Sequence, residues 1–174
     1  MSTQEAPIVN RVAKSGLVTV NLEDFRPGGE RALIDIKDQL YKELMFKEKD
    51  FRDWAESVDW AQYEGQKVAV TCSTDAIVPA WPFMLVATKL SGIADYVMFG
   101  TLDELEVELI KRELDKHDWS QYAGGKIVIK GCGNITEPLY VDVTRRLMPY
   151  VAKLMYGEPC SMVPLFKDLS RAKK

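Results

Sequence analysis

A pentapeptide pattern, Asp-Trp-x-Gln-Tyr, occurs twice in this chain and constrains its fold more than any other feature. It begins at Asp59 and again at Asp118, and in both copies a glycine and then a lysine precede an apolar run. The second copy follows the first by 59 residues. Matched sequence at a fixed spacing indicates matched backbone. The pattern therefore predicts two repeat-like units, at about residues 44–100 and 101–160.

A second repeated pattern marks the ends of these units. Val97–Phe99 and Leu154–Tyr156 are similar apolar tripeptides, and each is followed by a glycine. A third version, Leu44–Phe46, stands at the start of the first unit. Each tripeptide predicts a short buried strand.

Strands and helices are expected to alternate along the rest of the chain. Lys67–Thr71 and Lys126–Lys130 are rich in β-branched residues, which favours strands. Helical spacing or start signals predict helices at Pro82–Ser91, Leu102–Lys116 and Val141–Lys153. Thr101 and Glu104 form a capping-box pattern before the second of these helices.

This order predicts an α/β fold: a single domain over residues 16–167, with a mainly parallel sheet covered by helices and an internal pseudo-repeat of βαβ-type units. Two N-terminal strands within Leu17–Ile36 are expected to add an edge hairpin. Residues 1–15 and 168–174 are expected to be tails.

The composition favours an ordinary globular protein in a reducing compartment. The chain has 174 residues, is 47% hydrophobic and carries a net charge of −3, which gives no general attraction to nucleic acid or to an anionic membrane. No uncharged run is long enough to span a membrane, and the first residues do not resemble a signal peptide. A cytoplasmic location is expected.

The three cysteines follow predicted strands, and this placement predicts a site. Cys72, Cys132 and Cys160 each come at or soon after the end of an apolar run. In parallel sheets, ligands bind beyond the carboxyl ends of the strands. Thiolates suit zinc and iron–sulfur clusters, so the sequence predicts a three-cysteine metal site at this edge.

Other residues at the predicted strand ends complete this hypothesis. Asp75 and Glu158 are the candidate catalytic residues, as a base or as a fourth ligand. Trp81 and Asn134 are the candidate cofactor-binding residues, because both lie in loops that follow predicted strands.

Three alternatives stay open. The cysteines are structural in a non-catalytic binding or scaffold protein, which could form a homodimer through the apolar segments 148–150 and 162–166. A thiol-dependent enzyme without metal would use Cys160. An anion site would use Lys47, Lys49 and Lys130 near the strand ends. The one histidine, His117, is expected at the surface.

Several longer motifs resemble one bacterial family. They are Gly29–Arg31, Ile34–Asp38, Lys47–Arg52, Cys72–Pro79 and Gly157–Leu165. Together they extend over about residues 8–167, and on them the chain resembles the DUF2480 family of unknown function. The resemblance implies membership of this family and no particular activity.

Overall fold

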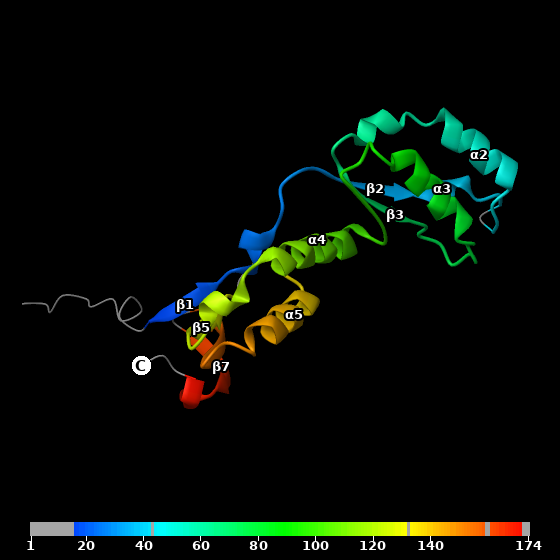
Figure 1. Ribbon diagram of the computed structural model, residues 1–174. Coiled ribbons are helices and arrows are strands. Elements are labelled where there is room, and N and C mark those ends of the chain that lie inside the picture. Colours follow the sequence, from blue (N-terminus) through cyan, green and yellow to red (C-terminus); the bar gives the residue numbers. More distant parts are fainter. Residues whose placement is uncertain (1–15, 43, 132, 159–160, 172–174) are drawn as a thin grey trace, which may run out of the picture. The chain divides into compact units, whose positions relative to one another are not determined.

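The computed structural model describes residues 16–42, 44–131, 133–158 and 161–171 (Figure 1). Its strands are β1 (Leu17–Val20), β2 (Arg31–Asp35), β3 (Lys67–Thr71), β4 (Tyr96–Phe99), β5 (Lys126–Ile129), β6 (Lys153–Glu158) and β7 (Ser161–Lys167). Its α-helices are α2 (Glu48–Ser57), α3 (Trp81–Leu90), α4 (Leu102–Lys116) and α5 (Glu137–Leu147). Short 3-10 turns are η1 (Leu22–Phe25), η2 (Ile36–Gln39), η3 (Trp60–Tyr63), η4 (Trp119–Tyr122) and η5 (Leu169–Arg171).

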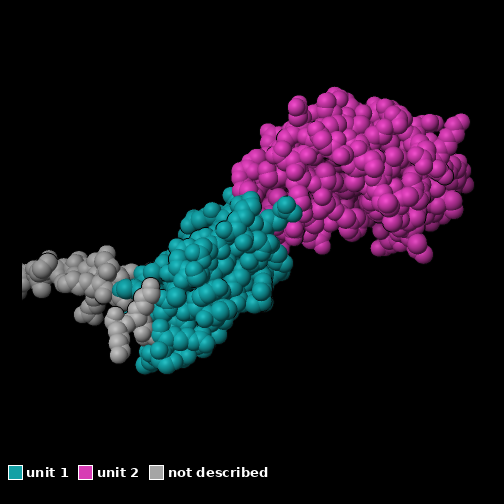
Figure 2. All heavy atoms as spheres, in the orientation of Figure 1, with its two compact units in different colours: residues 1–26, 110–174 teal, residues 27–109 magenta. Residues whose placement is uncertain are grey.

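The strands pair in two sheets. One has the order β2-β3-β4 and is parallel throughout, and the other has the order β1-β5-β6-β7, with only β7 antiparallel. The predicted α/β class with mainly parallel pairing is confirmed, but the strands are divided between two sheets where one was expected. The chain forms two compact units, unit 1 from residues 1–26 and 110–174 and unit 2 from residues 27–109 (Figure 2).

The two N-terminal strands belong to different sheets. β1 pairs with β5, and β2 pairs with β3, so they do not form the expected edge hairpin. Local sequence favours a hairpin because only a turn-rich segment separates them. Both strands instead find parallel partners far along the chain, and short-range patterns carry no information about such partners.

In unit 2, helices cover both faces of the three-stranded sheet. Alternate β3 residues point to opposite faces. Val68 and Val70 pack with Phe51 of α2 and Val86 of α3 on one face. On the other face, Ala69 packs with residues of α4 up to Leu109. The central strand β3 is therefore buried on both faces, as is typical of parallel sheets covered by helices.

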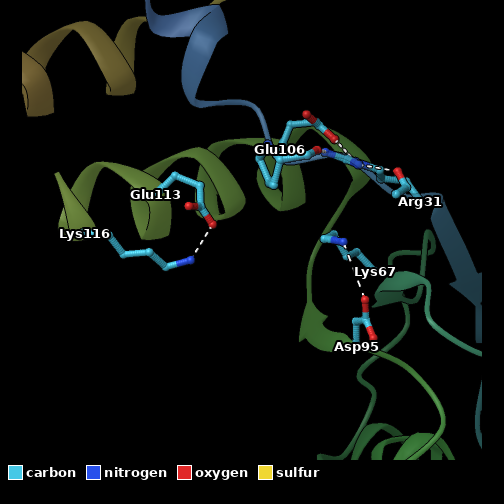
Figure 3. A network of polar contacts seen from close by, with 8 residues as sticks. Arg31, Lys67, Asp95, Glu106, Glu113 and Lys116 are labelled. Atoms are coloured by element: carbon cyan, nitrogen blue, oxygen red, sulfur yellow. Dashed lines mark hydrogen bonds and ion pairs between the residues drawn. The ribbon is translucent and has the colours of Figure 1, made fainter.

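Polar contacts hold the beginning of β2 in place (Figure 3). Arg31 donates from Nε to Glu106 of α4 at 2.5 Å, and its Nη2 donates to the carbonyl of Pro27 at 2.8 Å. Lys67, the first residue of β3, lies 3.8 Å from the carboxylate of Asp95. These contacts lie at the amino ends of the strands and leave the carboxyl ends free of them.

In unit 1, β5 is buried between β1 and β6, and α5 contributes a helical stripe to the core. Leu139, Val143 and Leu147, spaced by four residues, are each at most 2% exposed. The edge strand β7 exposes Val163 and contains Pro164. A proline on an edge strand removes a donor that could pair with another chain.

Both Asp-Trp-x-Gln-Tyr segments form the same turn before a strand. The side chains of Asp59 and Asp118 accept a hydrogen bond from the amide two residues later, at 3.1 and 3.0 Å. The indoles of Trp60 and Trp119 are buried and donate to a carbonyl five residues earlier, at 2.8 and 3.0 Å. These segments therefore cap the 3-10 turns η3 and η4 and pack into the core.

Two predicted elements differ from the structure. Leu44–Phe46 does not form a buried strand: Leu44 is 67% exposed, and Met45 forms only an isolated bridge with Tyr41. The last helix runs from Glu137 to Leu147, earlier than predicted, because Pro138 suits its first turn and Pro149 cannot continue it. Within the described ranges, no helix has the length and apolar character needed to cross a membrane.

Candidate functional site

The carboxyl ends of β2 and β3 lie beside a pocket in unit 2. The pocket has a volume of about 500 Å³, in the range of small-molecule sites. Its lining comes from η2, the turn after η2 and the loop after β3: Lys37, Asp38, Leu40, Lys42, Ser73 and Thr74. Ligands of parallel sheets bind beyond the carboxyl ends of the strands, so the pocket lies where the topology favours a site.

Asp35, the last residue of β2, connects the two walls of this pocket. One of its carboxylate oxygens accepts hydrogen bonds from the amides of Lys37 and Ser73, both at 3.1 Å. The other accepts from the hydroxyl of Ser73 and lies 3.4 Å from the ammonium of Lys37. One side chain therefore orients η2 and the loop after β3 toward each other.

These contacts set the charge state of Asp35. Partial burial opposes its ionisation, but the hydrogen bonds from Ser73 and Lys37, together with the Lys37 charge, outweigh that cost. The pKa of Asp35 is therefore below the usual aspartate value, and Asp35 is ionised at neutral pH.

A tight turn carries Lys42 to the pocket. Lys42 has a φ of +51°, which is uncommon for a residue other than glycine. The turn is closed by a hydrogen bond of 2.7 Å from the amide of Tyr41 to the carbonyl of Met45. The ammonium of Lys47 lies 3.4 Å from the centre of the Tyr41 ring, a cation–π contact that anchors the turn.

Unit 1 has a corresponding corner after β1, and there the protein fills it with its own side chains. Glu23 of η1 accepts a hydrogen bond from the amide of Asn134 at 3.2 Å. Arg26 donates to the carbonyl of the same residue at 2.9 Å. Gly133 has a φ of +130°, and a Cβ there would lie 2.7 Å from the Glu23 carboxyl group. This loop is held tightly against η1.

The three-cysteine metal site is wrong. Among the described residues, no group of three or more His, Cys, Asp or Glu side chains could hold a metal ion. Cys132 and Cys160 lie outside the described residues. Cys72 follows β3 in one sheet, whereas the strands that precede the other two cysteines, β5 and β6, belong to the other sheet. The prediction assumed a single sheet edge, and that premise fails.

Cys72 itself is a free, partly buried thiol. Burial and the neighbouring charge of Asp35 raise its pKa, which favours the neutral thiol over the thiolate. A neutral thiol is a poor nucleophile and a poor metal ligand.

The other candidate residues lie apart from the pocket lining. Asp75 is exposed in the loop after β3, and Trp81 packs edge-on against Phe51, with ring centres 5.3 Å apart. Asn134 is held by η1 through its backbone. One oxygen of Glu158 is buried and has no hydrogen-bond donor among the described residues. The assignment of these four as site residues stays a prediction.

Sequence reasoning missed the pocket lysines. The anion alternative named Lys47, Lys49 and Lys130, whereas Lys37 and Lys42 line the pocket. A signal was present in the tetrapeptides at 21–24 and 35–38, which share a pattern of Asn or Asp, an apolar residue, a charged residue and Asp.

The role of His117 was also missed. Its ring lies 4.7 Å from Trp119 and 5.0 Å from Phe25, and its Nε2 lies 3.1 Å from the hydroxyl of Tyr122. It is therefore part of a half-buried aromatic cluster in unit 1, not a solvated surface residue.

The fold and this pocket define an α/β protein of two units, with mainly parallel sheets and a small polar pocket at one sheet edge. The chain belongs to the family described as protein of unknown function DUF2480, which matches residues 6–168. This confirms the resemblance. No curated protein and no solved structure matches the chain.

Proposed function

We propose that this protein is a non-catalytic binding protein, and that the pocket of unit 2 holds a small ligand with a carboxylate group. The proposal depends on a comparison of the corner after β2 with the corner after β1. The observation that carries it is that Glu23, a carboxylate of the protein itself, binds the loop backbone in the corner after β1.

The two units are proposed to be copies of one βαβαβ motif, with unit 2 inserted after the first strand of unit 1. Equivalent pairings support this: β1-β5-β6 and β2-β3-β4 are parallel and run in the same order. Both first strands lead into a 3-10 turn. The capping side chains of these turns, Asn21 and Asp35, each accept a hydrogen bond from the amide two residues later.

Under this alignment, Lys37 stands in η2 where Glu23 stands in η1. Leu40 likewise stands in the place of Arg26. In unit 1 the corner holds a carboxylate that bonds to the loop backbone. In unit 2 the same corner has a cation and an open volume of about 500 Å³. A carboxylate supplied by a ligand would take the place that the Glu23 carboxylate has in unit 1.

The charges around the pocket favour such a ligand. Lys37 and Lys42 both line it. Lys37 is already 3.4 Å from Asp35, but an ammonium group has three donors and can also bond to a second carboxylate. Thr74 adds a hydroxyl that makes no hydrogen bond with any described residue. These groups recognise an anion without a metal or a thiolate, and the raised pKa of Cys72 supports binding over thiol catalysis.

Binding of simple carboxylates to the full chain tests the proposal. Propionate and succinate would be titrated calorimetrically, with chloride at equal ionic strength as the control. Lys37→Glu is expected to weaken binding at least about tenfold, because it places in unit 2 the carboxylate that closes the corner of unit 1. Lys49→Glu on α2 outside this pocket is the matched control. If neither acid binds, or if both variants behave alike, the proposal is wrong.

A further inference from the structure

A second difference between the two corners concerns an aspartate. In unit 1, Asp24 of η1 accepts a hydrogen bond of 2.9 Å from the side-chain amide of Asn21. Asp38 is the corresponding residue of η2 and lines the pocket. The residue in the place of Asn21 is Asp35, whose ionised carboxylate has no hydrogen to donate.

The carboxylate of Asp38 has therefore lost the donor that its counterpart uses. Among the described residues, no hydrogen bond or ion pair to Asp38 is found in its place. The pocket thus presents Asp38, a negatively charged hydrogen-bond acceptor, beside the cation Lys37, which precedes it in the chain. A simple carboxylate would satisfy Lys37 and leave Asp38 without a partner, and the two negative charges would repel each other.

We infer that the ligand is a zwitterion of the amino acid type, whose carboxylate is bound by Lys37 and whose ammonium group is bound by Asp38. This inference rests on the proposed function and names the chemical class of its ligand. The two substitutions relative to unit 1, Glu23 to Lys37 and Asn21 to Asp35, then have complementary effects. Lys37 in place of Glu23 opens a place for an anionic group. Asp35 in place of Asn21 leaves the Asp38 carboxylate free to accept from a cationic group. Charge-assisted hydrogen bonds of both kinds are the stronger class of polar contact.

Pairs of probes that differ only in the amino group test this inference. Alanine would be compared with propionate, and aspartate with succinate, by calorimetric titration of the full chain. The amino acid of each pair is expected to bind about threefold to tenfold more tightly, as one exposed charge-assisted hydrogen bond would give. Asp38→Asn should remove this difference and raise the affinity for propionate, because it removes the negative charge that repels the carboxylate. Lys37→Gln should weaken both members of each pair.

The outcomes separate the two proposals. If propionate and alanine bind equally to the wild-type protein, the zwitterion inference is wrong while carboxylate binding stands. If the advantage of alanine persists in Asp38→Asn, its ammonium group is bound elsewhere, and the inference also fails. If no probe binds, the carboxylate site itself is refuted, and the inference falls with it. Asp38 is exposed, so circular dichroism should show an unchanged fold in its variant.

Discussion

The corner after β1 and the corner after β2 share a backbone design and differ in their side chains. In both, a 3-10 turn follows the first strand, and a carboxylate binds an amide of the loop after the middle strand. In unit 1, Glu23 and Arg26 fill the space between the turn and the loop. In unit 2, Lys37 and Leu40 line a pocket. On the proposal that the two units are copies of one motif, a few substitutions distinguish the filled corner of unit 1 from the open pocket of unit 2.

The largest loss of stability is expected from substitution of the two buried tryptophans, one in the core of each unit. The two variants therefore compare the two cores. Trp60→Ala and Trp119→Ala should each lower the free energy of unfolding by about 3–5 kcal/mol, because each leaves a large cavity and removes the hydrogen bond of a buried indole. Chemical denaturation followed by circular dichroism would measure this. The corresponding Trp→Phe variants, which keep an aromatic ring, should cost less. A loss below about 1 kcal/mol for one alanine variant alone would break the equivalence of the two cores.

The tightness of the unit 1 corner can be tested at Gly133. Gly133→Ala should destabilise the protein by about 1–3 kcal/mol, because φ there is +130° and the new Cβ would approach Glu23. Gly28→Ala in unit 2 is the control, since a Cβ at that position would meet no other atom within 4 Å. Adding Glu23→Ala to Gly133→Ala should relieve the contact but not the backbone strain. If both glycine variants unfold alike, the corner of unit 1 is not tightly packed.

A pH series compares a carboxylate of each unit. Burial opposes the ionisation of Asp142, but hydrogen bonds from Arg146 and Arg145 outweigh it, so the pKa of Asp142 is lowered, as is that of Asp35. A lowered pKa stabilises the fold above the unfolded value of about 3.9, and this stabilisation is lost as pH falls through the lower folded value. We therefore expect Asp142→Asn to cost about 1 kcal/mol at pH 7.

The same series should show that cost disappearing below about pH 4, where the wild-type carboxyl group also becomes protonated. Urea midpoints at pH 7, 5 and 3 would measure it. Asp35→Asn should behave in the same way for unit 2. Asp53→Asn, at an exposed position of α2 without an ion pair among the described residues, is the control. A cost for Asp142→Asn that stays constant down to pH 3 would contradict the assignment.

The smallest change in stability is expected at the N-terminal caps of two helices, α4 and α5. Thr101 and Glu104 form a reciprocal capping box at α4, with bonds of 2.8 and 3.3 Å involving the two amides. Thr136 stands at the corresponding position of α5 and makes no capping bond with its side chain. Thr101→Ala should therefore cost about 1 kcal/mol, and Thr136→Ala close to nothing. Thermal unfolding of the two variants would show the difference, and equal costs would argue against the cap.

Local signals in the sequence were sufficient to place two of the helices. Spacing and capping residues correctly placed α4, and Pro82 correctly marked the start of α3. The partition into two sheets could not be predicted, because β1 pairs with β5 across more than a hundred residues and short-range patterns do not encode partners. The cysteine hypothesis failed for this reason. The pocket was missed because it arises from side chains that Asp35 brings together from two segments.

Nuclear magnetic resonance of the full chain, titrated with propionate, tests the central claim most directly, because it reports on both corners in one experiment. We expect shifts of the Ser73 and Thr74 amides and little change at the Asn134 amide, whose corner Glu23 already closes. In Lys37→Glu, the shifts at Ser73 and Thr74 should vanish. Shifts centred on Asn134, or shifts at Ser73 and Thr74 that persist in Lys37→Glu, would contradict the claim.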